Sequence, residues 1–134
     1  MTAEQRQQNF EKFYAYQGFN AHNGIRLVDV DDGMSVIEVA LTPEGLNPHN
    51  IAHGGLIFTL CDVATGVAAR TGGRNTVTQD ASIYFMKPGK NTTKLTAKGR
   101  VLKEGRNTGI CEAEVFTDDG TLIAKSTATV FFVG

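Results

Sequence analysis

One apolar segment, from Asn47 to Ala69, constrains the fold of this chain more than any other. It opens with turn-forming residues and passes through His53-Gly54-Gly55 into a run of apolar and small residues. Between Gly54 and Ala69 the only formal charge belongs to Asp62. A carboxylate in an apolar helix costs free energy unless it is paired or used. We therefore predict a long, mostly buried helix over residues 53–70 and regard Asp62 as its strongest functional signal.

Strand-like segments make up most of the remaining sequence, and turn-forming residues such as Asp31-Asp32-Gly33 separate them. Short turns between long strands imply antiparallel neighbours. The sequence thus predicts an α+β fold, in which a sheet of about six strands wraps its apolar face around the central helix. The expected strands are 25–30, 34–41, 76–86, 93–103, 108–117 and 122–132.

The N-terminal residues predict a further, short helix. Thr2 and Gln5 have the spacing of a capping box. The aromatic residues that follow fall at helical spacing, so they either pack on the edge of the core or line a substrate channel. We place this helix and its connection in residues 1–20 and interpret residues 1–134 as a single domain. The aromatic residues are Phe10, Phe13 and Tyr14.

Composition and charge narrow the classes of partner. Thirteen basic and fourteen acidic residues give a net charge of -1, which argues against nucleic acid or an anionic membrane bound over the whole surface. The N-terminus lacks the apolar core of a signal peptide, and the apolar run 56–69 is too short to span a bilayer. Cys61 and Cys111 lack metal-site spacing. We predict a cytoplasmic protein with structural thiols and no metal.

The start of the central helix is suited to binding an oxygen atom that gains charge. Gly54 and Gly55 have no Cβ, so a ligand can approach their backbone closely. The first N–H groups of a helix lack internal partners and carry the positive end of its dipole. Such a donor would stabilise a carbonyl oxygen that becomes negative in a tetrahedral transition state. Simple packing of the two glycines against a strand is the alternative.

Asp62 could act as a general base on water, as a nucleophile, or only as a buried hydrogen-bonding residue. It follows Gly54 by eight residues, which is about 12 Å along a helix at 1.5 Å per residue. Its carboxylate therefore cannot reach a carbonyl held at Gly54 of its own chain. If both groups serve one reaction, two central helices must pair antiparallel about a twofold axis. A dimer would also cover the open edge of the sheet.

The spaced motif Asn47, His53-Gly54-Gly55 and Asp62, followed by a strand with Thr78 that ends in Tyr84-Phe85-Met86-Lys87-Pro88, resembles the hotdog-fold acyl-CoA thioesterases. It is similar to their phenylacetate-degradation (PaaI-like) branch, which is related to 4-hydroxybenzoyl-CoA thioesterases. The likeness runs from about residue 25 to the C-terminus. It implies a long helix wrapped by an antiparallel sheet, a homodimer, and usually a dimer of dimers, or homotetramer.

The resemblance also implies roles for individual residues. Gly54 N–H would polarise the thioester carbonyl, and Asp62 of the partner chain would supply the base or nucleophile. Asn47 would position the carbonyl or the water, and His53 would support the loop. Thr78 falls where some relatives have a hydroxyl near the attacking water. Asp80, two residues further on, is expected on the same strand face as Thr78.

Coenzyme A has phosphates that need basic residues at the mouth of a cleft. Candidates near strand ends are Lys87, Lys90, Arg100, Lys103 and Arg106, and in similar proteins the nucleotide lies near the segment that corresponds to 103–107. The aromatic residues Phe10, Phe13, Tyr14, Phe58 and Tyr84 suggest room for an aryl or medium-chain acyl group. The predicted substrate-binding residues are Gly55, Phe58, Thr65, Lys87, Lys103, Gly105 and Arg106.

The leading prediction is hydrolysis of an acyl-CoA thioester to a free acid and coenzyme A. No dinucleotide fingerprint is present, so no redox cofactor is expected, and coenzyme A enters only as part of the substrate. A hotdog hydratase or dehydratase, with His53 and Asp62 as its acid–base pair, is one alternative. A non-catalytic acyl-CoA binding module is the other, although a pure binder gains nothing from an unpaired buried carboxylate.

Overall fold

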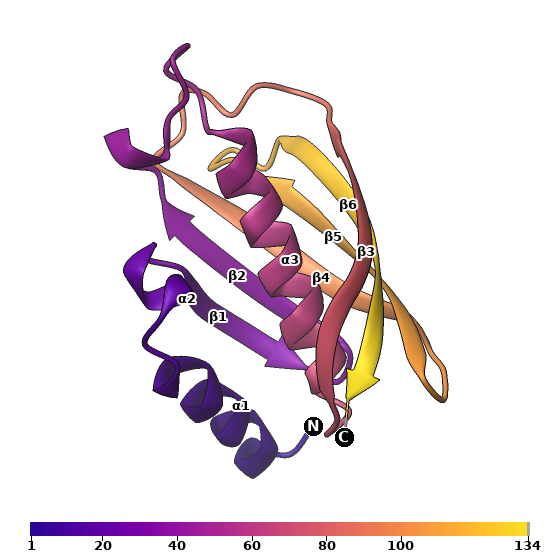
Figure 1. Ribbon diagram of the computed structural model, residues 1–134. Coiled ribbons are helices and arrows are strands. Elements are labelled where there is room, and N and C mark those ends of the chain that lie inside the picture. Colours follow the sequence, from indigo (N-terminus) through magenta and orange to yellow (C-terminus); the bar gives the residue numbers. More distant parts are fainter. Residues whose placement is uncertain (134) are drawn as a thin grey trace.

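The computed structural model describes residues 1–133. Six strands and one long helix form the body of the molecule, and shorter helical segments lie beside them (Figure 1). The helical segments are α1 (Ala3–Ala15), α2 (Phe19–His22), the 3-10 turn η1 (Pro43–Gly45) and α3 (Gly54–Arg70). The strands are β1 (Arg26–Asp31), β2 (Met34–Ala40), β3 (Asn75–Phe85), β4 (Lys94–Glu104), β5 (Thr108–Phe116) and β6 (Leu122–Val133).

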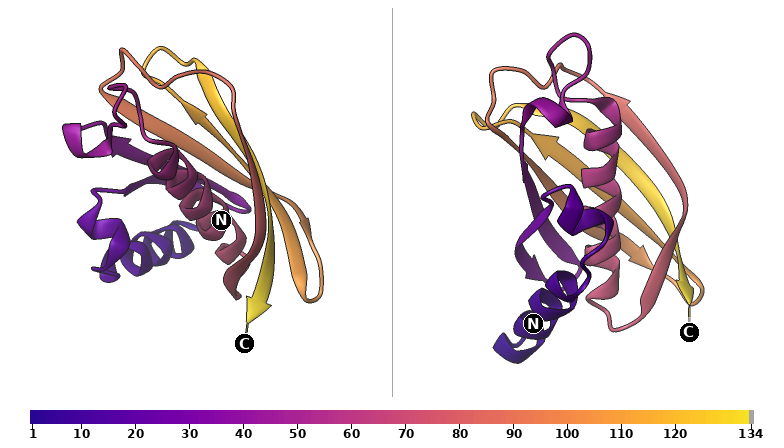
Figure 2. Two further views of the ribbon diagram at one scale, coloured as in Figure 1. Left: turned by 45° about the horizontal axis from the view of Figure 1, so that its top comes forward. Right: turned by 60° about the vertical axis from the view of Figure 1, so that its left-hand side comes forward.

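The sheet has the order β1-β2-β4-β5-β6-β3, with antiparallel neighbours throughout. It curves around α3, which lies across its concave face (Figures 1 and 2). The predicted hotdog architecture is confirmed, and each strand begins and ends within one residue of its predicted bounds. The alternation along β2 fixes its faces as expected, since Ser35, Ile37 and Val39 are buried beneath α3 while the residues between them are more exposed.

Helix α3 packs its small residues directly onto the sheet. Leu60, Ala64 and Ala68 are fully buried, and the Ser35 hydroxyl donates a 2.7 Å hydrogen bond to the Ala64 carbonyl. Opposite that carbonyl, β4 has Gly99, where an added Cβ would lie 2.4 Å from the Ala64 oxygen. The absence of a side chain at Gly99 thus lets the helix backbone approach the sheet. Among residues 1–133, no helix has the length and apolar character that a bilayer crossing requires.

Substitution of Gly99 by alanine should destabilise the fold. The new Cβ would overlap backbone atoms of Ala64, and α3 would have to move away from β4. Overpacking of this kind costs about 1–3 kcal/mol, so we expect a clear fall in the thermal midpoint of Gly99→Ala. Calorimetric melting of the purified variant measures it. An unchanged midpoint would contradict the close packing of α3 on β4.

The N-terminal helix packs against the edge of the sheet. Its capping box is confirmed, since the Thr2 hydroxyl accepts from Gln5 N at 3.1 Å and the Gln5 side chain accepts from Thr2 N at 2.8 Å. Phe13 is buried, and the Tyr14 hydroxyl accepts from Leu27 N and donates to Leu27 O on β1. These two aromatic residues therefore anchor α1. The sequence predicts a connecting segment where the single turn α2 lies, because four residues are too few to show helical periodicity.

Strand β3 forms an open edge of the sheet. It pairs only with β6 among residues 1–133, so the backbone groups along its other side have no strand partner there. Several apolar side chains on and just beyond this strand are more than a third exposed: Val77, Tyr84, Phe85 and Met86. An unpaired edge with exposed apolar groups is a template for association. The structure thus has the open edge that the sequence predicts.

Candidate active site

His53 organises the start of α3 and leaves one backbone donor open. It is the N-cap residue, and its Nδ1 accepts a 2.8 Å hydrogen bond from Gly55 N. The Gly54 N–H, in contrast, has no hydrogen-bond partner within residues 1–133. Of the two glycines, Gly54 is therefore the one whose donor is available. The cap also agrees with the predicted loop-supporting role of His53.

Gly54 lines a cavity of about 350 Å³ together with Asn47, Phe85 and Lys87. Asn47 holds the turn that leads to the helix, because its Oδ1 accepts from His49 N at 2.9 Å and from Ile51 N at 3.4 Å. Its side-chain NH₂ group has no partner within residues 1–133. Asn47 is thus a turn residue whose amide donors remain available beside Gly54.

The Asp62 carboxylate is half-buried and has one protein partner. The Thr78 hydroxyl on β3 donates a 2.6 Å hydrogen bond to its Oδ1, so the structure brings these two predicted site residues together. The other threonines near Asp62 serve the helix backbone instead. Thr59 donates to Gly55 O, and the fully buried Thr65 donates to Cys61 O and Asp62 O. Because Thr65 is buried in the core, the prediction that it contacts the substrate is wrong.

Asp80 is on the opposite face of β3 from Thr78, contrary to the prediction. Thr78 pairs with the buried Val130 of β6, whereas Asp80 pairs with its neighbour Thr129. A β-bulge between Thr78 and Asp80 shifts the register by one residue. Residues directly opposite each other in an antiparallel pair share a face, and a bulge reverses the alternation that follows it. Asp80 therefore lies on the outer face of the sheet, away from Asp62.

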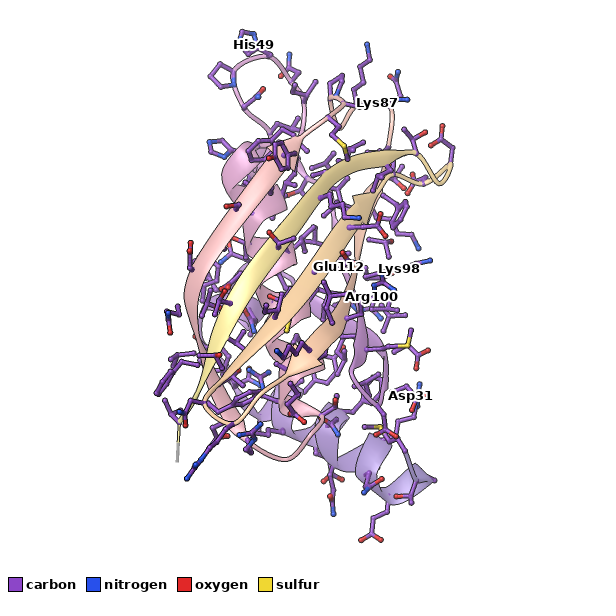
Figure 3. The ribbon with its side chains drawn as sticks, turned by 90° about the vertical axis from the view of Figure 1, so that its right-hand side faces the viewer. Asp31, His49, Lys87, Lys98, Arg100 and Glu112 are labelled. Atoms are coloured by element: carbon purple, nitrogen blue, oxygen red, sulfur yellow. The ribbon has the colours of Figure 1, made fainter. Side chains whose placement is uncertain are left out.

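The predicted coenzyme A contacts lie at two opposite ends of the molecule. Lys87 lies near the start of α3, on the same cavity as Gly54 (Figure 3). Lys103, Gly105 and Arg106 belong to the β4–β5 hairpin, which lies at the C-terminal end of α3 (Figure 1). One extended ligand could contact both groups only by running the length of the helix, or by binding between two chains.

Arg100 has a structural partner on the outer face of the sheet. Its guanidinium forms an ion pair with the buried Glu112 (Figure 3). Glu112 also lies 3.7 Å from Lys125. Without Arg100, the buried Glu112 carboxylate would keep only the more distant Lys125 as a partner. We therefore assign Arg100 to the stability of the sheet rather than to coenzyme A.

The five aromatic residues do not form one acyl pocket. Phe13 is in the core, the Tyr14 hydroxyl binds Leu27, and Tyr84 pairs with Lys125 on the outer face of the sheet. Only Phe58 lies on α3, where it is exposed. The sequence does not show this difference, because it does not tell on which surface α1 and β3 place their aromatic rings.

Sequence reasoning missed a second hollow beside the helix start. It measures about 830 Å³ and lies between α2, η1 and the first turns of α3. His53 and Gly55 line it from the helix, and Phe19 and His22 line it from α2. Residues of α2 and the end of β2 line it together, an arrangement that local sequence patterns do not determine. The Gly54–Gly55 pair thus has a cavity on either side.

Both cysteines are structural. Cys61 is 2% exposed and Cys111 is 0% exposed, and they form no disulfide. Burial raises the pKa of each thiol to about 11, so neither is a thiolate at neutral pH. No group of three or more His, Cys, Asp and Glu side chains in residues 1–133 has the arrangement of a metal site.

We expect both thiols of the native protein to resist a disulfide reagent such as DTNB at pH 8. Burial and the raised pKa values suppress attack by the thiolate. In guanidinium chloride both should react at once, which provides the matched control. Rapid reaction of either thiol in the native protein would contradict its assignment as a structural residue.

Comparison with known proteins identifies the family. The thioesterase superfamily matches residues 49–124. The acyl-coenzyme A thioesterase PaaI of Escherichia coli is 30% identical over 117 residues, which cover 87% of this chain and 84% of PaaI. Its solved structure, described as from the phenylacetic acid degradation operon, superposes with a TM-score of 0.92 at 27% identity, over 100% of this chain and 97% of that one.

Two streptococcal structures are also similar. A Streptococcus mutans protein bound to acetyl CoA gives a TM-score of 0.81 at 30% identity, covering 89% of this chain and 96% of its own. A hypothetical thioesterase of Streptococcus pneumoniae, solved with coenzyme A, gives 0.77 at 33% identity, covering 82% and 89%. The same protein was solved as two alanine variants, of an aspartate and of a threonine that follows it by sixteen positions. Fold, motif and relatives agree: the chain belongs to the thioesterase superfamily, in its PaaI-like hotdog branch, and is a thioester hydrolase.

Proposed function

We propose that this protein hydrolyses acyl-CoA thioesters, with Gly54 N–H and Asp62 contributed to each site by different chains. The open Gly54 donor next to the Asn47 amide is the observation that carries the proposal. The PaaI relative is named an acyl-coenzyme A thioesterase, and two similar proteins were solved with acetyl CoA or coenzyme A. These relatives support coenzyme A as the leaving thiol.

The chemistry follows from the groups at the two half-sites. The thioester carbonyl oxygen accepts from Gly54 N–H, which stabilises the negative charge of the tetrahedral intermediate. Asp62 takes a proton from the attacking water, or attacks the carbonyl carbon itself and is then released by water. The C–S bond breaks and coenzyme A leaves as a thiolate, which takes up the proton that the hydrolytic water gives up. Thr78 orients the carboxylate through its 2.6 Å hydrogen bond to Oδ1.

The separation of sixteen positions between Asp62 and Thr78 supports a joint role for these two residues. In the S. pneumoniae relative, an aspartate and a threonine with the same separation were each changed to alanine. That choice agrees with a joint role for the two residue types in this family. The role of Thr78 in this chain remains our proposal.

Dimerisation would bring the half-sites together. The open edge of β3 and the exposed side of α3 lie next to each other, so two chains can pair their edges and their helices antiparallel. Asp62 of one chain would then approach Gly54 of the other. The β4–β5 hairpin of one chain would also approach Lys87 of its partner. We propose that such dimers pair into tetramers and that the protein works in the cytoplasm.

A hydratase site would need an acid–base pair, for which His53 of one chain and Asp62 of its partner are the candidates. Within one chain, His53 Nδ1 accepts from Gly55 N and Asp62 Oδ1 accepts from the Thr78 hydroxyl. A saturated acyl-CoA distinguishes the two activities, since a hydratase releases no thiol from it.

The proposed function is tested by thiol release. Aryl, short, medium and long acyl-CoAs would be incubated with the oligomer, and free coenzyme A would be measured with DTNB. We expect turnover that saturates with at least one of these substrate classes. Tight binding of acyl-CoA without any release of thiol would instead identify a binding module and contradict the proposal.

A further inference from the structure

Arg74 joins three segments at the C-terminal end of α3. It lies in the short connection between α3 and β3, and its guanidinium donates to two carbonyls of the β4–β5 turn. Nη1 is 2.7 Å from Arg106 O, and Nη2 is 2.9 Å from Gly105 O. The guanidinium also lies 3.6 Å above the ring of Phe132 on β6 and 3.6 Å from a carboxylate oxygen of Glu104.

This arrangement fixes the shape of the turn. A planar guanidinium holds two adjacent carbonyls in one orientation, and stacking on an aromatic ring limits its own movement. Two backbone hydrogen bonds also hold the turn, from Gly105 N to Thr108 O and from Phe132 N of β6 to Asn107 O. Neither of them involves the Gly105 or Arg106 carbonyl, which Arg74 orients. Arg74 therefore holds the turn at a defined position relative to α3.

The turn held in this way is basic and open to ligands. Lys103 and Arg106 are exposed, and neither side chain forms an ion pair within residues 1–133. The contacts of Arg74 are to backbone carbonyls, so its hydrogen bonds leave the Arg106 side chain available. Glu104 is the one acidic residue of the hairpin tip, and it faces Arg74. The exposed charge at the tip is consequently positive.

We propose that Arg74 is a positioning residue, which holds the β4–β5 turn so that Lys103 and Arg106 meet the phosphates of coenzyme A. This inference rests on the proposed function, because the ligand is the nucleotide end of an acyl-CoA. The thioester end would lie at Gly54 of the partner chain, which the antiparallel pairing of the α3 helices brings toward this hairpin. Loss of Arg74 should thus weaken nucleotide binding without changing the chemistry.

Two substrates with the same acyl group distinguish an effect on nucleotide binding from an effect on the chemical step. Acyl-CoA has the phosphates, whereas the acyl-pantetheine has the same arm and thioester without the nucleotide. For Arg74→Ala we expect KM for acyl-CoA to rise about tenfold with kcat unchanged, since uniform binding affects KM alone. KM for the acyl-pantetheine should stay as in the wild type. Arg6→Ala is the matched control, because Arg6 also forms an ion pair and a cation–π contact, with Asp29 and Phe10.

Arg74→Lys distinguishes positioning from direct charge. Lysine keeps the positive charge but cannot hold two carbonyls in one plane, so we expect its KM to resemble that of Arg74→Ala. Wild-type KM in Arg74→Lys, or equal losses with both substrates, would overturn the proposal while leaving the thioesterase function in place. Absence of thiol release by the wild type from either substrate would contradict the proposed function itself.

Discussion

Replacement of Asp62 by asparagine is expected to remove most thioesterase activity while the oligomer stays intact. The amide keeps the size of the side chain and can still bond with the Thr78 hydroxyl, but it can neither accept a proton from water nor attack a carbonyl. Loss of a general base lowers the rate roughly 100- to 10,000-fold. We expect this loss in kcat, with KM little changed, as measured by thiol release.

Asp80→Asn is the matched control for this experiment. Asp80 lies on β3 close to Thr78, but the bulge places it on the outer face of the sheet. The same change of charge at Asp80 should leave kcat within about twofold of the wild type, as surface substitutions usually do. Full activity in Asp62→Asn would refute Asp62 as base or nucleophile.

Gly54→Pro is expected to have the second large effect, because it deletes the proposed oxyanion donor without breaking the helix. Gly54 is the first residue of α3, where proline is tolerated and where no intrahelical hydrogen bond is lost. His53 has φ -66° and ψ 136°, the extended conformation that proline requires of the preceding residue. Removal of one oxyanion donor costs roughly 100- to 1,000-fold in kcat.

Gly54→Ala keeps the N–H and therefore serves as the matched comparison. Its Cβ would lie 3.4 Å from the Phe85 ring, an ordinary contact, but would project beside the ligand position. We expect a loss of activity about tenfold smaller than that of Gly54→Pro. Melting curves of both variants establish that the helix is retained. Equal losses in the two variants would show that added bulk, not the missing donor, causes the effect.

Much of the fold could be predicted from local pattern. Turn residues such as Asp31-Asp32-Gly33 marked strand boundaries to within one residue, and the uninterrupted apolar run after Gly54 marked α3. The face of Asp80 could not be predicted in this way. A bulge at one position reverses every side chain after it, and nothing in the composition of β3 signals where the bulge occurs.

The residues of the candidate site could be predicted from the sequence, but most of their hydrogen-bond partners could not. The helix rise alone separates Gly54 from Asp62, but it does not show that Asp62 bonds to Thr78 on β3, while the nearby Thr59 and Thr65 bond to backbone carbonyls of α3. Helical neighbours three or four positions away often bond to backbone carbonyls instead, as both of these threonines do. The contacts of Arg74 could not be predicted from the sequence, because its partners are backbone carbonyls of a distant turn, which have no sequence signature.

A mixed dimer of two inactive variants examines the shared site itself. Asp62→Asn and Gly54→Pro chains with different affinity tags would be co-expressed, and the hetero-oligomer purified through both tags. One of its two sites would combine an intact Gly54 with an intact Asp62, so activity should return to about half that of the wild type. No recovery in the mixed dimer, or full activity from a wild-type monomer, would contradict a site built from two chains.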